Sequence, residues 1–187
     1  MKTQPVFITG NLHKAQHIER LLGLHIPHRR VELDEIQSAT PEEIIEHKVR
    51  QAYEIVKQPV FVDDFSLWFD ELDGLPGPFI KFFVNANNGI ENLCRMADGL
   101  ASRRATARAY FGYFDGSEIT ILHGELKGEI ADHPRGNLEY AFGSDPIFCV
   151  DGYGGRSRAE LDHREYDEVY IKLRAIDAMR EFLKGKV

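Results

Sequence analysis

The sequence predicts an α/β protein built on a mixed β-sheet. In its first half, short runs of β-branched and aromatic residues alternate with segments whose apolar residues recur at helical spacing. From 104 to 130, aromatic and β-branched residues dominate and indicate a β-meander. The length of 187 residues, 43% of them hydrophobic, suits one globular domain or two closely packed lobes. No repeat and no low-complexity linker divides the chain, so a single domain over 1–187 is expected around this sheet.

The N-terminal elements follow from local patterns. "PVFIT" (5–9) predicts a strand, the "GN" after it a turn, and the apolar spacing that follows a helix. "RRVEL" (29–33) predicts a second strand. "TPEE" (40–43) has the N-cap, the first-turn proline and the third-position acid of a capping box. A helix is therefore expected from this point to about Val56.

The remaining elements are predicted in the same way. "PVFVD" (59–63) reads as a third strand, which "SLWF" (66–69) continues after a kink. Helical spacing returns between Phe79 and Met96, and "PIFCV" (146–150) predicts another strand. A final amphipathic helix is expected over 167–183. Strands and helices that alternate early and give way to a meander favour a mixed sheet.

Composition excludes several classes of protein. The formal net charge of −7 argues against general affinity for nucleic acid or for anionic membranes. The two cysteines form no C-x-x-C motif, so free thiols are expected, although a disulfide stays possible. No leader-like stretch and no long apolar run is present. We therefore expect a soluble cytoplasmic protein.

"TGNLHK" (9–14) joins the first strand to the first helix. Such a loop offers free backbone N–H groups at a helix N-terminus, where anions commonly bind. Thr9 and Asn11 add polar side chains, and Lys14 on the first helical turn is placed to meet a phosphate. The alternative is an ordinary turn followed by a solvated lysine.

Three carboxylates are candidates for a metal site. Asp63 and Asp64 are adjacent at the end of a predicted strand, and like charges at the edge of a core need a counter-charge. With Glu35 they form a set of hard oxygen ligands suited to Mg²⁺, which would be that counter-charge. The alternative is that the two aspartates face solvent or cap a turn.

Two lysines and one turn complete the candidates. Lys48 flanks the apolar stripe of its helix, and Lys81 stands among apolar residues in "PFIKFF". Each of these lysines either snorkels to solvent or points at an anion. The "FGSD" turn (142–145) presents Phe142 and Asp145 beside a strand, so the ring is either a stacking surface for a base or part of the core.

The order of these segments resembles one family, the inosine triphosphate pyrophosphatases, over nearly the whole chain. The matching segments are "VFITGNLHK", "VELDEIQ", "PVFVDDFSLWFDELDGLPGPFIKFF", "PRG", "FGSDPIF" and "DGY" followed by "AEL". The resemblance implies an elongated α/β fold with two lobes flanking a cleft. It also implies a homodimer, Mg²⁺ dependence, and hydrolysis of nonstandard purine nucleoside triphosphates to the monophosphate and pyrophosphate.

The resemblance also implies residue roles. Glu35, Asp63 and Asp64 would hold the metal, and Asp64 would in addition direct or deprotonate the attacking water. Lys14 would share in catalysis, and Phe142 would stack on the base. The substrate would be bound by Thr9, Gly10, Asn11, Lys14, Lys48, Lys81, Phe142, Gly143, Ser144, Asp145 and Lys172.

The chain departs from the family pattern mainly where the base is read. Phe65 and Ser66 follow the paired acids in place of Ser or Thr and Gly, and Ser144 replaces a large residue. Tyr166 and Asp167 replace Lys and Asn, and Tyr170, Ile171 and Lys172 replace Ser-His-Arg. Because Ile171 cannot donate to a 6-oxo purine, we expect altered or relaxed base specificity. The alternative is a catalytically impaired nucleotide-binding protein with a regulatory or assembly role.

Overall fold

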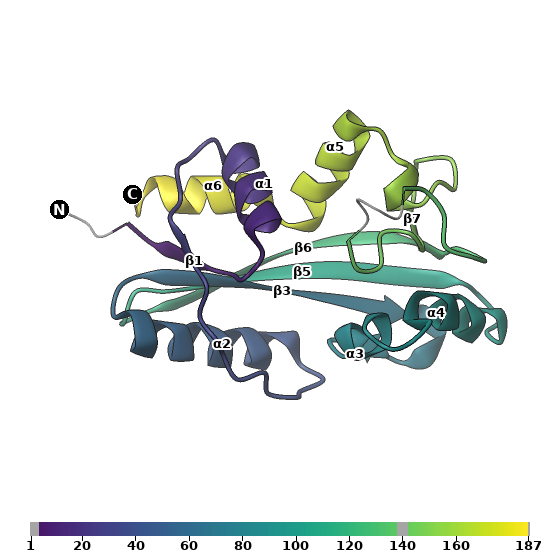
Figure 1. Ribbon diagram of the computed structural model, residues 1–187, viewed down its shortest axis with the longest axis horizontal. Coiled ribbons are helices and arrows are strands. Elements are labelled where there is room, and N and C mark those ends of the chain that lie inside the picture. The colour runs from purple at the N-terminus through teal and green to yellow at the C-terminus, as the bar shows by residue number, and fades with distance from the viewer. Residues whose placement is uncertain (1–3, 138–141, 187) are drawn as a thin grey trace. The chain divides into compact units, whose positions relative to one another are not determined.

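The structure, a computed structural model, describes residues 4–137 and 142–186 (Figure 1). Its elements, in chain order, are β1 (Val6–Ile8), α1 (Leu12–Leu22), β2 (His28–Arg29), α2 (Pro41–Val56), β3 (Val60–Phe69), η1 (Asp70–Leu72), β4 (Pro76–Gly77), α3 (Ile80–Val84), α4 (Gly89–Asp98), β5 (Arg104–Phe114), β6 (Ile119–Ile130), β7 (Phe148–Val150), η2 (Arg158–Glu160), α5 (His163–Leu173) and α6 (Ile176–Lys184). None of the helices described has the length and apolar character needed to span a bilayer.

The strands in the described part of the chain form one seven-stranded sheet. Its order is β2-β1-β3-β5-β6-β7, and β4 pairs with β3 outside this path. β1 runs parallel to both β2 and β3, whereas β4 is antiparallel to β3 and β7 is antiparallel to β6. The sheet is therefore mixed and has helices packed beside it, which confirms the predicted α/β class.

The chain divides into two compact units. The described residues up to Asp64 form the first unit together with 109–124 and 171–186. Residues 65–108 and the described part of 125–170 form the second. The chain thus passes from one unit to the other within β3, β5, β6 and α5.

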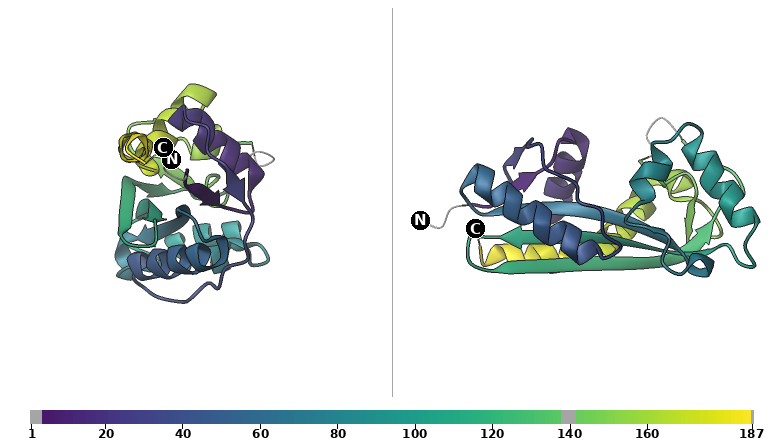
Figure 2. Two further views of the ribbon diagram at one scale, coloured as in Figure 1. Left: turned by 90° about the vertical axis from the view of Figure 1, so that its left-hand side faces the viewer. Right: turned by 90° about the horizontal axis from the view of Figure 1, so that it is seen from below.

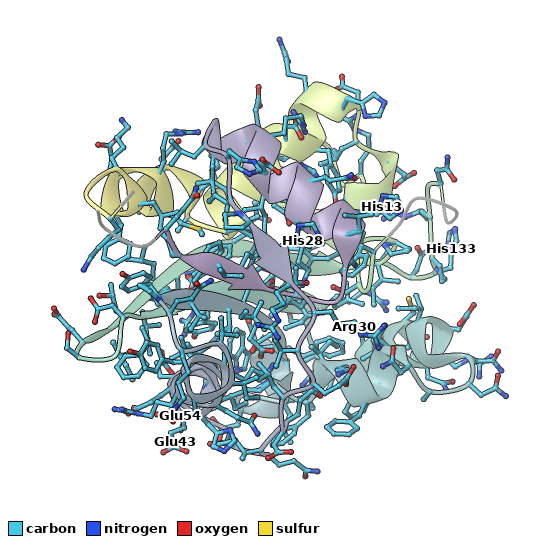
Figure 3. All side chains as sticks on the ribbon, turned by 60° about the vertical axis from the view of Figure 1, so that its left-hand side comes forward. His13, His28, Arg30, Glu43, Glu54 and His133 are labelled. Carbon is cyan, nitrogen blue, oxygen red and sulfur yellow. The ribbon has the colours of Figure 1, made fainter. Side chains whose placement is uncertain are left out.

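In the first unit, helices cover both faces of the strands. Figure 1 and the left view of Figure 2 show α2 on one face and α1 with α6 on the other. Phe7 of β1 stacks on Phe61 of β3 with ring centroids 4.7 Å apart, and both are buried. Glu43 and Glu54 lie on the outer side of α2, away from the sheet (Figure 3). The apolar stripe of α2 therefore faces the strands.

In the second unit, α3 and α4 lie side by side, and Arg103 ties α4 to a strand end. Arg103 donates to the carbonyl oxygen of Ile130 at 2.7 Å and to that of Cys94 at 3.2 Å. Cys94 and Cys149 are buried free thiols, as the sequence predicts. The predicted single helical stretch over 79–96 is two helices, because the chain turns between Val84 and Gly89.

The start of α2 differs from the predicted capping box. The helix covers the predicted residues, but the side chain of its N-cap Thr40 makes no capping hydrogen bond. Ser38 Oγ instead joins two groups of the expected box: it accepts from the Thr40 N–H at 3.0 Å and donates to Glu43 Oε2 at 2.6 Å. The predicted strand over 29–33 is likewise shorter, since β2 covers only His28–Arg29.

The predicted final helix is also two helices. α5 ends at Leu173, and α6 begins after Ala175, whose φ of 47° is left-handed. The buried residues Val169, Leu173 and Ile176 continue the same apolar spacing across the break, so the sequence pattern gives no sign of it. Arg174 stands at this junction.

Gly124 of β6 allows the end of α5 to pack against the sheet. A Cβ at this position would lie 2.2 Å from the carbonyl oxygen of Lys172 and 2.5 Å from that of Leu173. We expect Gly124→Ala to lower the free energy of unfolding by about 1–3 kcal/mol, because backbone must move to admit the methyl group. Urea denaturation measures this change. Gly99→Ala is the control, since its Cβ would lie 3.8 Å from the Met96 carbonyl oxygen; an equal loss in both variants would contradict the packing argument.

Candidate functional site

The loop between β1 and α1 presents a helix N-terminus, as the sequence predicts. Asn11 is the N-cap of α1, and its Oδ1 accepts from the Lys14 N–H at 2.9 Å. The Asn11 N–H donates to Thr9 Oγ1 at 3.1 Å, and Gly10 between these two residues is exposed. The first backbone N–H groups of a helix lack intrahelical partners and carry a partial positive charge. The loop therefore has the features of an anion-binding site.

Asp63 of β3 is a buried carboxylate held by two cations. Lys14 Nζ lies 3.1 Å from Oδ1 and 3.0 Å from Oδ2, and Arg174 Nη1 donates to Oδ2. The Asp63 side chain is only 4% exposed. Burial by itself would raise the pKa of Asp63, but the charges and hydrogen bonds of Lys14 and Arg174 lower it to about 2. Asp63 is therefore ionised at neutral pH.

Asp64, the next residue of β3, pairs with a different lysine. Lys48 Nζ of α2 lies 2.6 Å from Asp64 Oδ1 and 4.0 Å from Glu35 Oε1. Lys48 and Asp64 are 12% and 18% exposed, and Glu35 is 48% exposed. Burial raises the pKa of Asp64 and nearby Asp63 adds to this, although Lys48 acts in the opposite direction. The Lys48 ammonium therefore lies between the carboxylates of Asp64 and Glu35.

The two adjacent carboxylates point to opposite faces of the sheet, because successive side chains of a strand alternate. Asp63 meets Lys14 of α1 and Arg174 before α6, whereas Asp64 meets Lys48 of α2. The ribbon shows the same division, with α1 and α6 on one face and α2 on the other (Figure 1). The sequence suggested a metal ion as the missing counter-charge, and in the structure cationic side chains of the protein take that place.

The predicted gathering of three acids around one ion is not formed. Over residues 4–137 and 142–186, no three Asp, Glu, His or Cys side chains lie close enough together to hold one metal ion jointly. The strand alternation explains this, since it turns Asp63 away from Asp64. Glu35 and Asp64 are the two predicted metal ligands that share a neighbour, Lys48.

In the second unit, the turn at 142–145 is fixed by the carboxylate of Asp145. Asp145 is 2% exposed, and its Oδ2 accepts from the Phe142 N–H at 3.2 Å. Gly143 has a left-handed φ of 58°, which suits glycine. Ser144 is buried, whereas Phe142 is 54% exposed. The turn therefore presents an aromatic ring to solvent and keeps its polar side chains inside.

Two further residues complete the environment of Asp145. Arg158 Nη1 lies 2.7 Å from Oδ1, and the Tyr166 hydroxyl donates to Oδ2 at 2.9 Å. The Arg158 guanidinium also lies over the Tyr166 ring, 5.2 Å from its centroid. Burial and the Asp145 charge raise the pKa of Tyr166, so that its hydroxyl keeps its proton and donates.

The two remaining predicted lysines are both exposed. Lys81 lies on α3 in the same unit as the 142–145 turn. Lys172 lies in the last turn of α5, in the unit that holds Lys14 and Lys48. Apart from these two lysines, the candidate residues lie in three groups. One group is the first loop with Asp63, another surrounds Lys48, and the third is the 142–145 turn.

Sequence reasoning missed two buried arginines, Arg158 and Arg174, which are 5% and 6% exposed. A signal was present for Arg174, because it stands between Leu173 and Ile176, both predicted to face the core. A charged residue among such neighbours indicates a buried partner. No comparable pattern marks Arg158, whose partner Asp145 is recognisable only in three dimensions.

Known proteins resemble this chain along nearly its full length. Residues 5–182 match the model of the Ham1 family. The inosine triphosphate pyrophosphatase of Emericella nidulans is 38% identical over 181 residues, which is 95% of this chain and 94% of that protein. The dITP/XTP pyrophosphatase of Methanopyrus kandleri is 34% identical over 188 residues, 97% of each chain.

A solved structure also matches this chain over nearly its full length. A HAM1 protein from Coxiella burnetii superimposes with a TM-score of 0.83 and 26% identity, over 97% of this chain and 98% of that one. The resemblance noted from the sequence motifs is thus confirmed along nearly the full length. On these matches, the chain belongs to the Ham1 family.

Proposed function

We propose that this protein hydrolyses nonstandard purine nucleoside triphosphates such as ITP, dITP and XTP to the nucleoside monophosphate and pyrophosphate. The names of the relatives in Emericella nidulans and Methanopyrus kandleri support this reaction class. The observation that carries the proposal is the grouping, in one unit, of Lys14 at a helix N-terminus with Lys48 between Asp64 and Glu35. Water would attack the α-phosphorus, and the bond to the bridging oxygen would break to release pyrophosphate.

We further propose that Glu35 and Asp64 hold Mg²⁺. Both side chains offer hard carboxylate oxygens beside Lys48, and Mg²⁺ usually takes one or two carboxylates and completes its shell with water and phosphate oxygens. When bound, the ion would offset charge on the phosphates. Asp63, turned to the other face, would instead hold Lys14. By family resemblance, Asp64 would also direct or deprotonate the attacking water.

The phosphates would be bound by the first loop and by lysines. Thr9, Gly10 and Asn11 precede the N-terminus of α1, whose N–H groups suit an anion. Lys14 and Lys48 would offset the charge that builds on the leaving pyrophosphate. By family resemblance, Lys81 would contribute further positive charge. Lys172, which stands where the family pattern has an arginine, is a further candidate for binding the substrate.

The base would stack on Phe142. This ring is exposed, and its backbone N–H is fixed by Asp145, so the turn is an ordered platform. Asp145 is already engaged by Arg158 and Tyr166, which supports a role in shaping the turn. With Ser144 buried and Ile171 unable to donate, discrimination between bases is expected to be weaker than in a site rich in donors.

We also propose, from the family resemblance, that residues 1–187 act as one domain and that the protein is a cytoplasmic homodimer. Light scattering of the purified protein measures the second point directly, with a mass near that of two chains as the expected result.

The reaction is tested with a nucleotide panel. The purified protein with Mg²⁺ is expected to release pyrophosphate from ITP, dITP and XTP, with ATP and GTP as the comparison bases. Pyrophosphate and orthophosphate are assayed separately. Release of orthophosphate alone, or binding of nucleotide with no release at all, would reject the proposal.

Asp64→Asn is expected to reduce turnover of ITP by about 10²–10⁴-fold, because the variant loses a metal ligand and a proton acceptor. Steady-state kinetics and circular dichroism together separate lost chemistry from lost folding. Asp73→Asn removes the same charge from an exposed position and is expected to leave turnover unchanged. Normal turnover in Asp64→Asn would move the catalytic role to another residue.

Glu35→Gln is expected to raise the Mg²⁺ concentration for half-maximal rate by at least about tenfold. The reason is that loss of a residue that only supports a metal ligand already weakens metal binding by about that factor. The measurement is the rate of pyrophosphate release against Mg²⁺ concentration. Glu32→Gln is the matched control, since Glu32 is exposed and pairs with Arg30. An unchanged Mg²⁺ requirement in Glu35→Gln would exclude Glu35 as a ligand.

Tyr166→Phe removes one hydrogen bond to the buried carboxylate of Asp145. We expect the free energy of unfolding to fall by about 1.5–3 kcal/mol, the usual range for a hydrogen bond to a charged group. The KM for ITP should rise with little change in kcat, because the turn that carries Phe142 loosens. In an Asp145→Asn background the same substitution should cost less; equal costs in both backgrounds would show that the hydroxyl acts elsewhere.

A further inference from the structure

Arg174 is placed beside the sheet by the break between α5 and α6. Leu173 is the last residue of α5, and Ala175, with its left-handed backbone, is the N-cap of α6. The Arg174 side chain is 7% exposed, and its Nη1 donates to Asp63 Oδ2. A guanidinium from the C-terminal part of the chain is thus bonded to a strand 111 residues earlier.

Asp63 connects Arg174 to Lys14. The carboxylate accepts from Lys14 Nζ at both oxygens, at 3.1 and 3.0 Å, and from Arg174 at one of them. One carboxylate therefore faces two cations, and the three side chains together carry an excess positive charge. Lys14 is 20% exposed, against 4% for Asp63 and 7% for Arg174. Lys14 is thus the most solvent-accessible of the three side chains.

Lys14 is fixed at two points. Its backbone N–H donates to the N-cap side chain of Asn11 at 2.9 Å, and its ammonium is bound to Asp63. The positive end of the α1 dipole and the ammonium group therefore lie in the same first helical turn. If Asp63 moved, the ammonium would lose this contact, although the helix N-terminus would stay in place.

We infer that Arg174 is a positioning residue for the phosphate end of the substrate, acting by fixing the Asp63 carboxylate that holds the Lys14 ammonium at the N-terminus of α1. This inference rests on the proposed function. Arg174 itself does not touch the substrate. It keeps the carboxylate in place and balances its charge, so that Asp63 orients Lys14 without cancelling the attraction of Lys14 for an anion.

The alternative is that Arg174 only joins α6 to the rest of the unit. Arg180 of α6 provides the matched control, because it makes a contact of that kind. It donates to the carbonyl oxygens of Leu22 at 2.9 Å and Leu21 at 2.5 Å, at the opposite end of α1 from Lys14. Loss of Arg180 therefore weakens the packing of α6 against α1 without removing charge beside Asp63.

The test compares Arg174→Gln, Arg174→Lys and Arg180→Gln by steady-state hydrolysis of ITP with Mg²⁺. We expect Arg174→Gln to raise KM about tenfold with kcat within about threefold, as expected when a charge-assisted contact that orders a binding group is lost. Arg174→Lys should recover part of the loss, since it keeps the charge but not the planar fork. Arg180→Gln should lower Tm and leave KM unchanged. Equal Tm losses with normal KM in both Gln variants would overturn the inference.

A double-mutant cycle tests the route through Asp63. If Arg174 acts by way of Asp63, Arg174→Gln should change KM by less than about twofold in an Asp63→Asn background. A full tenfold change in that background would overturn the inference, because Arg174 would then act independently.

Calorimetric binding of pyrophosphate provides a readout that needs no turnover. The expected result is weaker binding by Arg174→Gln than by the wild type or Arg180→Gln, and equal binding by all three would overturn the inference. If the wild-type protein binds pyrophosphate but hydrolyses no nucleotide, the proposed function fails, and the binding comparison still decides the role of Arg174.

Discussion

Two adjacent aspartates on one strand point to opposite faces of the sheet, and the candidate site is arranged around that alternation. Each carboxylate is mostly removed from solvent, so each needs a cation of its own. Asp63 fixes Lys14 and Arg174 on the face covered by α1 and α6. Asp64 fixes Lys48 on the face covered by α2. The alternation along β3 therefore pairs Asp63 with Lys14, at the helix N-terminus, and Asp64 with Lys48, beside Glu35.

The second unit also contains a buried carboxylate, and different groups satisfy it. The buried carboxylate of Asp145 is satisfied by Arg158, by the Tyr166 hydroxyl and by the Phe142 N–H. Its acceptor capacity is thereby largely used inside the protein. The ring of Phe142, at the start of this turn, is 54% exposed. The Tyr166 hydroxyl keeps the turn bonded while adding no positive charge.

Local patterns predicted much of the fold. The strand–loop–helix at the N-terminus, the bounds of α2 and the long strands β5 and β6 all follow from periodicity and turn residues. The break at Ala175 did not, because alanine favours helix and the apolar spacing continues across it. Thr40 was expected to cap α2, yet Ser38 competes for the same groups. The partners of Asp63 stand 49 and 111 residues away in the chain, a distance over which sequence periodicity carries no information.

The contact between Lys48 and Asp64 affects how the newly synthesised chain can fold. Zinc-finger peptides stay unfolded until their ion arrives, because binding of the ion supplies their folding free energy. Here an ammonium group already neutralises the carboxylate at 2.6 Å. A newly synthesised chain can therefore reach its folded state while free divalent ions are scarce.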